Sequence, residues 1–271
     1  MRPGGDGRKG SYTSLWLLLV AAFVIIFTLS CFDNPPKIFG YSPKPSGMAD
    51  LILRDNATEE AAAPADNPAA EAAGTEPDTV ATDTATQTIL FIGDSMLDGL
   101  SPRLAAYASA SGHKLYSVTW YSSSTKVWAE SGKLEDYISR LKPTFIFICL
   151  GSNELNIKDI KSKRRECVNR ILAGIGTIPY LWIGPPNWKK DTGINELIAE
   201  STARGGYFKS DGMHFERRKD GAHPTAASAI VWMDSVVRWM PAHSFHPIRL
   251  DKPEKSTGRP TRLFTHSPQE I

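Results

Sequence analysis

The sequence predicts an α/β domain with a parallel sheet covered by helices on both faces, and three observations support this. Short apolar runs alternate with amphipathic stretches between Thr88 and Met240. The run "TFIFICL" at 144–150 is apolar on both faces, as expected of a strand with helices on either side. About 150 residues is a usual size for one such domain. Together they predict a three-layer α/β/α sandwich around a five-stranded parallel sheet.

The expected strands are short and are separated by helical patterns. The strands are "TILFIG" (88–93), "LYSVTW" (115–120), "TFIFICL" (144–150), "YLWIG" (180–184) and "GYFKS" (206–210). Helices are expected near 97–111, 132–141, 159–174 and 192–203, with a last one near 225–240. The last helix carries an apolar stripe from Ala226 to Met240 with a spacing of three or four residues, which indicates one buried face.

The N-terminal part contains an apolar run that predicts a membrane anchor. Residues 14–32, "SLWLLLVAAFVIIFTLSCF", have an uncharged core of about 16 to 18 residues, at the short end of the range for a spanning helix. The short segment 1–13 before it carries Arg2, Arg8 and Lys9, which favours a cytoplasmic N-terminus. We therefore expect a single-pass protein of the inner (cytoplasmic) membrane, with its main domain on the periplasmic or extracytoplasmic side.

Two other interpretations of this apolar run place the main domain outside the cytoplasm as well. A cleaved signal peptide would require a small-residue cleavage site, and none clearly follows the run. A lipoprotein signal would make Cys31 the lipidated residue, although Thr28, Leu29 and Ser30 match the usual small-residue pattern poorly. The uncleaved anchor is the interpretation that we favour.

Two further segments flank the predicted domain, which we bound at 88–241. Residues 33–87 form a linker rich in Ala, Pro, Thr and Glu that almost lacks large apolar side chains, so we expect it to be disordered. As a flexible coil of about 50 residues it would reach on the order of 40 Å. Residues 242–271 have scattered prolines and predict an extended tail, with three apolar residues able to pack on the domain: Phe245, Ile248 and Leu250.

Charge and cysteine content exclude several classes of function. The formal net charge is +2, which gives no electrostatic case for a nucleic-acid partner. The three cysteines form no CxxC or Cys/His cluster, so neither a metal site nor a cofactor is expected. Cys149 and Cys167 lie in an apolar run and in a predicted helix, which indicates buried positions.

Polar residues gather where the predicted strands end. Because sites in open α/β sheets lie at the carboxyl ends of the strands, these loops should meet at one edge. They contain Gly93-Asp94-Ser95, Tyr121-Ser122-Ser123-Ser124, Gly151-Ser152-Asn153-Glu154 and the stretch "KDGAHPT", which includes Asp220 and His223 before the last helix.

The residue types in these loops fit nucleophilic catalysis. Ser95 alone is a weak nucleophile, and His223 can serve as the base that accepts its proton. Asp220, three residues before His223, can hold the imidazole in the required tautomer. An acyl-transfer intermediate also needs donors for its oxyanion, and the candidates are the Ser95 N–H and the Asn153 side-chain amide.

This set of motifs resembles the SGNH hydrolase family, also called the GDSL lipase or esterase family, over roughly residues 88–240. The matching motifs are "GDS" at 93–95, "GSNE" at 151–154 and "DGAH" at 220–223, in this order along the chain. The resemblance implies a flavodoxin-like sheet, a serine nucleophile at Ser95, a histidine base and an aspartate three residues before it.

One feature departs from the family pattern. The family usually has a glycine after the second strand, whose backbone N–H is a third oxyanion donor. Here the stretch "WYSSSTKVWAES" has no glycine until Gly132. A serine N–H can serve equally, so Ser123 is our candidate for the third donor, with Ser122 and Ser124 as alternatives.

A second Asp-to-His pair and several softer candidates complete the predicted site. The stretch "DGMH" at 211–214 repeats the spacing of Asp220 and His223, but only the latter pair leads directly into the last helix. Candidate substrate contacts are Asp94, Gly151 and Trp188, and Glu154 is expected to be structural.

The sequence thus predicts an extracytoplasmic serine esterase that acts through an acyl-serine intermediate. A membrane tether favours a substrate at the cell envelope, such as the O-acetyl groups of a carbohydrate, although a small ester also fits. With a sugar hydroxyl as acceptor the same residues would give an O-acetyltransferase. A non-catalytic carbohydrate-binding module of the same fold is a third interpretation, and the altered loop after the second strand is its only support.

Overall fold

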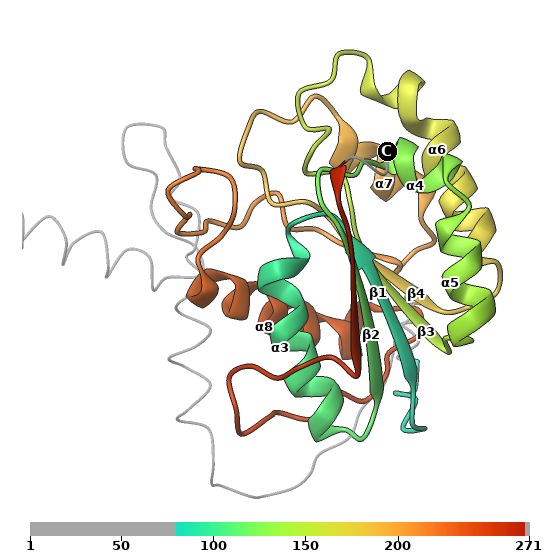
Figure 1. Cartoon of the computed structure of the whole chain (residues 1–271), viewed down its shortest axis with the longest axis vertical. Helices are drawn as coiled ribbons and strands as arrows, with labels where there is room; N and C mark the ends of the chain where they lie inside the picture. The colour runs from blue at the N-terminus through green and yellow to red at the C-terminus, as the bar shows by residue number, and fades with distance from the viewer. Residues whose placement is uncertain (1–79, 269–271) are drawn as a thin grey trace, which may run out of the picture. The chain divides into compact units, whose positions relative to one another are not determined.

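The computed structural model describes residues 80–268, and these contain an entirely parallel sheet of six strands in the order β5-β4-β3-β1-β2-β6 (Figure 1). The strands are β1 (Thr88–Gly93), β2 (Lys114–Trp120), β3 (Phe145–Cys149), β4 (Tyr180–Ile183), β5 (Tyr207–Phe208) and β6 (Arg262–His266). The α/β class and the parallel sheet are therefore confirmed. Because every pairing is parallel, all the strands end at the same edge of the sheet.

Helices cover both faces of the sheet, as predicted. They are α3 (Leu97–Ala110), α4 (Thr125–Glu130), α5 (Lys133–Leu141), α6 (Ile160–Ile175), α7 (Ile194–Ser201) and α8 (Ala226–His243). Helices α3 and α8 pack on one face, and α4 to α7 pack on the other (Figure 1). The layers follow from the buried side chains, which fall into two clusters separated by the sheet.

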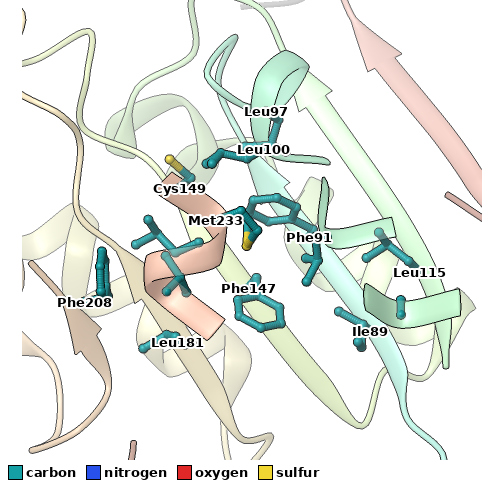
Figure 2. Close-up of a cluster of buried hydrophobic side chains, with 14 of the residues drawn as sticks. Ile89, Phe91, Leu97, Leu100, Leu115, Phe147, Cys149, Leu181, Phe208 and Met233 are labelled. Atoms are coloured by element: carbon teal, nitrogen blue, oxygen red, sulfur yellow. The ribbon is translucent and has the colours of Figure 1, made fainter. Parts of the chain in front are cut away.

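Strand β1 shows why the central strands read as continuous apolar runs. Ile89 and Phe91 join the cluster under α3 and α8, whereas Leu90 and Ile92 join the cluster on the other face. All four are 0% exposed. Figure 2 shows Phe91 close to Met233 of α8 within the first cluster. A strand that is buried on both faces has no polar positions to alternate with apolar ones.

The sixth strand corrects the predicted count of five. Strand β6 comes from the segment 242–271, which the sequence indicated as an extended tail outside the domain, and it pairs in parallel with β2. Its signal in the sequence is weak because an edge strand needs little apolar surface, and Leu263 is 55% exposed. Earlier in the same segment, Ile248 is buried in the core and Leu250 packs against it.

Helix α4 is a second difference from the predicted elements. The serine-rich stretch after β2 was expected to be a loop, but a short helix begins at Thr125. The Ser124 side chain caps it by accepting a hydrogen bond from the Val127 N–H (3.3 Å), and the helix buries its own residue Trp128. With six residues, this helix is too short to show a helical period in the sequence.

The predicted membrane helix at 14–32 and most of the linker at 33–87 lie outside the described residues. Within residues 80–268, none of the helices combines the length and the apolar composition that crossing a membrane requires. The prediction of an anchor therefore stays a prediction that depends on the sequence alone.

A buried arginine fastens the C-terminal segment to the helices. The Arg103 Nε donates to Asp234 Oδ1 (2.6 Å), and its Nη1 donates to the carbonyls of Lys255 (3.2 Å) and Ser256 (3.0 Å). The Arg103 side chain is 8% exposed, and Tyr107 also donates to Asp234 (2.9 Å). One guanidinium thus links α3, α8 and the segment that leads to β6.

We predict that Arg103→Ala lowers the free energy of unfolding by about 3 kcal/mol, because it leaves a partly buried carboxylate and two carbonyls without their donor. Arg170→Ala is the matched control, since Arg170 pairs with Glu166 at an exposed helical site. That change should cost less than about 0.5 kcal/mol. Urea denaturation of both variants measures the difference, and equal losses would contradict the assigned role of Arg103.

Candidate active site

Ser95 stands directly beyond the carboxyl end of β1. The preceding Gly93 lies so close to its neighbours that a Cβ there would come within 2.3 Å of the Cys149 carbonyl oxygen and of Leu97 Cδ1. The Asp94 N–H donates to the same Cys149 carbonyl (3.2 Å). These contacts end the strand tightly, so that Ser95 emerges partly exposed just before α3 begins.

His223 is held by a short antiparallel turn that leads into α8. Arg217 and Pro224 form an isolated bridge. Beside it, the Arg218 N–H donates to the His223 carbonyl (2.8 Å), and the Thr225 N–H donates to that of Glu216 (2.8 Å). The turn thereby fixes the backbone of His223 at the sheet edge where β1 ends.

The structure brings Ser95, His223 and Asp220 together in one hydrogen-bonded chain. The Ser95 Oγ lies 2.7 Å from His223 Nε2, and His223 Nδ1 lies 2.9 Å from Asp220 Oδ2. The carboxylate can only accept at Nδ1, so the imidazole proton resides there, and Nε2 is free to accept the Ser95 proton. The arrangement can therefore remove a proton from the serine hydroxyl.

Asp220 is suited to remain ionised in this chain. Its Oδ1 accepts the backbone N–H groups of Ala222 (2.8 Å) and His223 (2.9 Å). These two bonds, with the His223 side chain as a further donor, lower the pKa of Asp220 to about 2. The carboxylate therefore keeps its charge and its orienting contact with His223 throughout the neutral and mildly acidic range.

Arg217 supports the His223 turn, and the sequence analysis did not identify it. Its Nη1 donates to the Ala222 carbonyl (2.5 Å), and its Nη2 donates to that of Asn187 (3.1 Å) in the loop after β4. The first contact closes the His223 turn itself, and the second joins it to a loop 30 residues away. One arginine within the basic run 217–219 carries no sequence signal for such a role.

Backbone geometry distinguishes the candidates for the third oxyanion donor. The Ser123 N–H, our first candidate, is engaged because it donates to the Trp120 carbonyl (3.1 Å), and Ser123 is fully buried. Ser122 has a φ of +60°, the left-handed conformation that favours glycine. Within residues 80–268 the Ser122 N–H donates to no acceptor. Ser122 therefore replaces Ser123 as the better candidate, and the Ser124 N–H remains an alternative.

The other two candidate donors also keep hydrogen-bonding capacity. In the described part of the chain, the Ser95 N–H has no acceptor. The Asn153 Nδ2 donates one hydrogen to the Ser123 carbonyl (2.9 Å), and its second hydrogen remains for another partner. Asn153 itself is exposed.

Two of the candidate substrate contacts prove to be buried. Asp94 is 0% exposed, and its carboxylate accepts hydrogen bonds from Ser152 Oγ (2.5 Å) and the Met96 N–H (3.0 Å). Gly151 is also buried, with a φ of +116° that only glycine adopts readily. Both residues are therefore inaccessible to a substrate, and their role is to shape the loops.

Trp188, the third candidate contact, is half-buried at the same edge. Its Nε1 donates to the Ser152 carbonyl (3.0 Å), and the Lys189 ammonium lies 4.1 Å from the centre of its ring. Its role as a substrate contact stays a prediction.

Glu154 has a structural environment, as expected. It is 0% exposed and accepts from the Thr125 N–H (2.7 Å) and from Arg164 Nε (2.6 Å), which joins the loop after β3 to α4 and α6. In the alternative motif, Asp211 Oδ2 lies 3.8 Å from Lys209 Nζ, and no hydrogen bond joins Asp211 to the exposed His214. The second Asp-to-His spacing therefore does not form a pair.

Cys149 and the groups that could hold a metal ion are the remaining possible sources of chemistry in the described residues. Burial raises the pKa of the Cys149 thiol well above its usual value, with the nearby Asp94 charge as a smaller cause, so Cys149 is unsuited as a nucleophile. Among residues 80–268, no group of three or more His, Cys, Asp or Glu side chains is arranged to hold a metal ion.

Comparison with known proteins finds similar solved structures, one of which is an esterase. No family model and no curated protein matches the chain. The solved structure is a psychrotrophic esterase, EstA from Pseudoalteromonas sp., inhibited by monoethylphosphonate. The two are 16% identical with a TM-score of 0.40, over 56% of this chain and 98% of that chain. The resemblance to the SGNH family stays a prediction from the motifs.

The buried Asp94 predicts a specific dependence of stability on pH. Desolvation raises its pKa from 3.8 to about 6, so the folded protein holds this proton more tightly than the unfolded chain. The free energy of unfolding should therefore fall as the pH rises from about 4 to about 6, by on the order of 3 kcal/mol at 1.36 kcal/mol per pKa unit.

Asp94→Asn removes this titration and keeps the acceptor for Ser152. Denaturant unfolding of both proteins between pH 3.5 and 7 measures the difference in stability at each pH. We expect the wild type to lose stability relative to the variant as the pH rises. Parallel profiles would show that the Asp94 carboxyl does not titrate in this range.

Proposed function

We propose that this protein is a serine esterase with Ser95 as nucleophile, His223 as general base and Asp220 as the orienting carboxylate. The observation that supports this best is the hydrogen-bonded chain from Ser95 Oγ through His223 Nε2 (2.7 Å) and Nδ1 to Asp220 (2.9 Å). Ser95 comes from the loop after β1, and Asp220 and His223 come from the turn before α8. The two segments meet at the carboxyl edge of the sheet, where α/β folds bind their ligands.

The proposed reaction proceeds in two acyl-transfer steps. His223 Nε2 takes the Ser95 proton as Oγ attacks the ester carbonyl carbon, and the tetrahedral intermediate then expels the alcohol, which takes that proton. In the second step His223 accepts a proton from water, whose oxygen attacks the acyl-serine. The acid is released, and Ser95 Oγ recovers a proton from His223.

The intermediate of each step carries an oxyanion that needs donors. We assign the Ser95 N–H, the Ser122 N–H and the Asn153 Nδ2 to this role, since each has a hydrogen not used in a described contact. Loss of one such donor typically lowers the rate by about 10²- to 10³-fold. A backbone donor at Ser122 would explain why this residue adopts a conformation that serine usually avoids.

We further propose that the ester is an O-acetyl group on a cell-envelope carbohydrate, with the catalytic domain on the extracytoplasmic side. The support is the apolar stretch 14–32 preceded by Arg2, Arg8 and Lys9, followed by a linker that would act as a tether. A tethered domain reaches substrates near the membrane surface.

We predict that Ser95→Ala in the full-length protein lowers turnover of p-nitrophenyl acetate by roughly 10⁴-fold or more, because no other group replaces the nucleophile. Ser235→Ala, on the surface of α8, is the matched control and should keep wild-type turnover. Release of p-nitrophenolate measures both.

A wild type that turns over no faster than Ser95→Ala would count against the esterase. Adding a sugar as acceptor to the same assay tests the alternative of acetyl transfer. In that case the acetylated sugar appears and free acetate does not. Transfer without hydrolysis would replace the esterase with an O-acetyltransferase that uses the same residues.

The proposed backbone role of Ser122 gives a second prediction. Ser122→Gly keeps the N–H and relieves the left-handed strain, so turnover should be unchanged, and the protein should gain about 1 kcal/mol of stability. Ser124→Gly is the control, because Ser124 has an extended φ of −129° and caps α4. Ser124→Gly should gain no stability, because its backbone carries no left-handed strain to relieve. A large loss of turnover in Ser122→Gly would assign the function to the hydroxyl instead.

A further inference from the structure

A cavity of about 550 Å³ lies between the loop after β4, helix α7 and the end of β5, at the same edge of the sheet as the proposed active site. Neither Ser95 nor His223 lines it. Its volume falls in the range of cavities that bind small ligands. Its lining is rich in hydrogen-bonding groups, which include Asn187, Asp191, Asn195, Tyr207, Lys209 and Asp211.

One wall of the cavity is a fixed hydrogen-bond network. The Tyr207 hydroxyl donates to Asn195 Oδ1 (2.6 Å), and Asn195 Nδ2 donates to Asn187 Oδ1 (2.9 Å) and Asp191 Oδ2 (3.0 Å). Asp191 also accepts the Gly193 and Ile194 N–H groups at the start of α7. These side chains hold one another in place, so this wall is organised without a ligand.

Two other lining side chains, Lys209 and Asp211, keep hydrogen-bonding groups that are free to contact a ligand. Asp211 Oδ2 lies 3.8 Å from Lys209 Nζ, which is longer than a hydrogen bond. Asp211 Oδ1 is buried, so Oδ2 is the oxygen that can face a ligand. A carboxylate and an ammonium together accept from and donate to hydroxyl groups, which suits a ligand rich in hydroxyls.

The charges around the cavity favour a neutral ligand over an anionic one. Asp191, Glu196 and Asp211 line it with Lys209, and Glu196 is paired with Lys161 (2.8 Å), so one carboxylate charge remains uncompensated. The Tyr207 hydroxyl stays neutral, because burial, with the Asp211 and Asp191 charges as smaller causes, raises its pKa. An anionic group would face the repulsion of the carboxylates.

Two chains of hydrogen bonds connect the cavity wall to the neighbours of the proposed catalytic residues. Asn187 lines the cavity, and its carbonyl accepts from Arg217, which also holds the Ala222 carbonyl next to His223. The next residue, Trp188, donates to the carbonyl of Ser152, whose hydroxyl binds Asp94 beside Ser95. The cavity wall and the Ser95 loop therefore belong to one hydrogen-bonded network at the carboxyl edge of the sheet.

We propose that this cavity binds a neutral sugar unit of the substrate, which presents its ester to Ser95 across the loop that contains Asn187 and Trp188. This inference rests on the proposed esterase function and names the part of the substrate that the catalytic residues do not themselves recognise. Small esters without a sugar react without filling the cavity.

The test fills the cavity without touching its network. Ala199 lines the cavity on the exposed side of α7, so Ala199→Phe should occupy the space with little effect on folding. We expect kcat/KM for an O-acetylated methyl glucopyranoside to fall at least tenfold, equivalent to about 1.4 kcal/mol. Turnover of p-nitrophenyl acetate should be unchanged.

The matched control is Ala110→Phe, which fills a separate cavity of about 450 Å³ between α3 and the C-terminal segment. Ala110→Phe should leave the turnover of both substrates at the wild-type level. If Ala199→Phe leaves kcat/KM for the sugar ester unchanged, the proposal is overturned. Equal losses of activity on both substrates would overturn it as well.

A binding measurement on the Ser95→Ala protein separates this proposal from the catalytic one. Saturation-transfer NMR with methyl glucopyranoside should detect binding to Ser95→Ala and none to Ser95→Ala/Ala199→Phe, whatever the esterase assay shows. Glucuronate, the anionic counterpart, should bind more weakly. Absence of glucopyranoside binding, or equal binding of glucuronate, would overturn the cavity assignment and leave the test of Ser95 intact.

Discussion

Parallel pairing of β1 with β2 on one side and β3 on the other is the constraint on which the candidate site depends. The register places Gly93 opposite Thr119 and Cys149, so three strands end side by side. The loops that follow them are consequently neighbours, although they are separated by tens of residues in the chain. Without this alignment Ser95, Ser122 and Asn153 would share no edge.

Hydrogen bonds between these loops then hold the edge rigid. Ser152 of the third loop binds the buried Asp94 of the first, and the amide of Asn153 binds the carbonyl of Ser123 in the second. Arg217 connects the His223 turn to the loop after β4. A site built from separate loops needs such support, because a shift of about 1 Å at the reacting atoms is costly in rate.

The differences from the predicted structure share one physical cause. Strand β6 is an edge strand whose stability comes from pairing with β2, and its own apolar content is low. The burial of Asp94 depends on Ser152, which is distant in the sequence, and the hydrogen bond of the Ser123 N–H to Trp120 depends on the exact path of a turn. Sequence patterns report local periods and residue types, and they contain no direct record of such contacts.

Local pattern alone determined the strands around β1 and β3, because a strand buried on both faces must be apolar at every position. It also singled out Ser95, Asp220 and His223, because their chemistry requires those residue types at strand and helix ends. Only the tertiary structure decided that Ser95 and His223 lie within hydrogen-bonding distance, that Arg217 supports the turn, and that a polar cavity adjoins the site. These features arise where segments distant in the chain meet, and packing of the whole sheet sets their geometry.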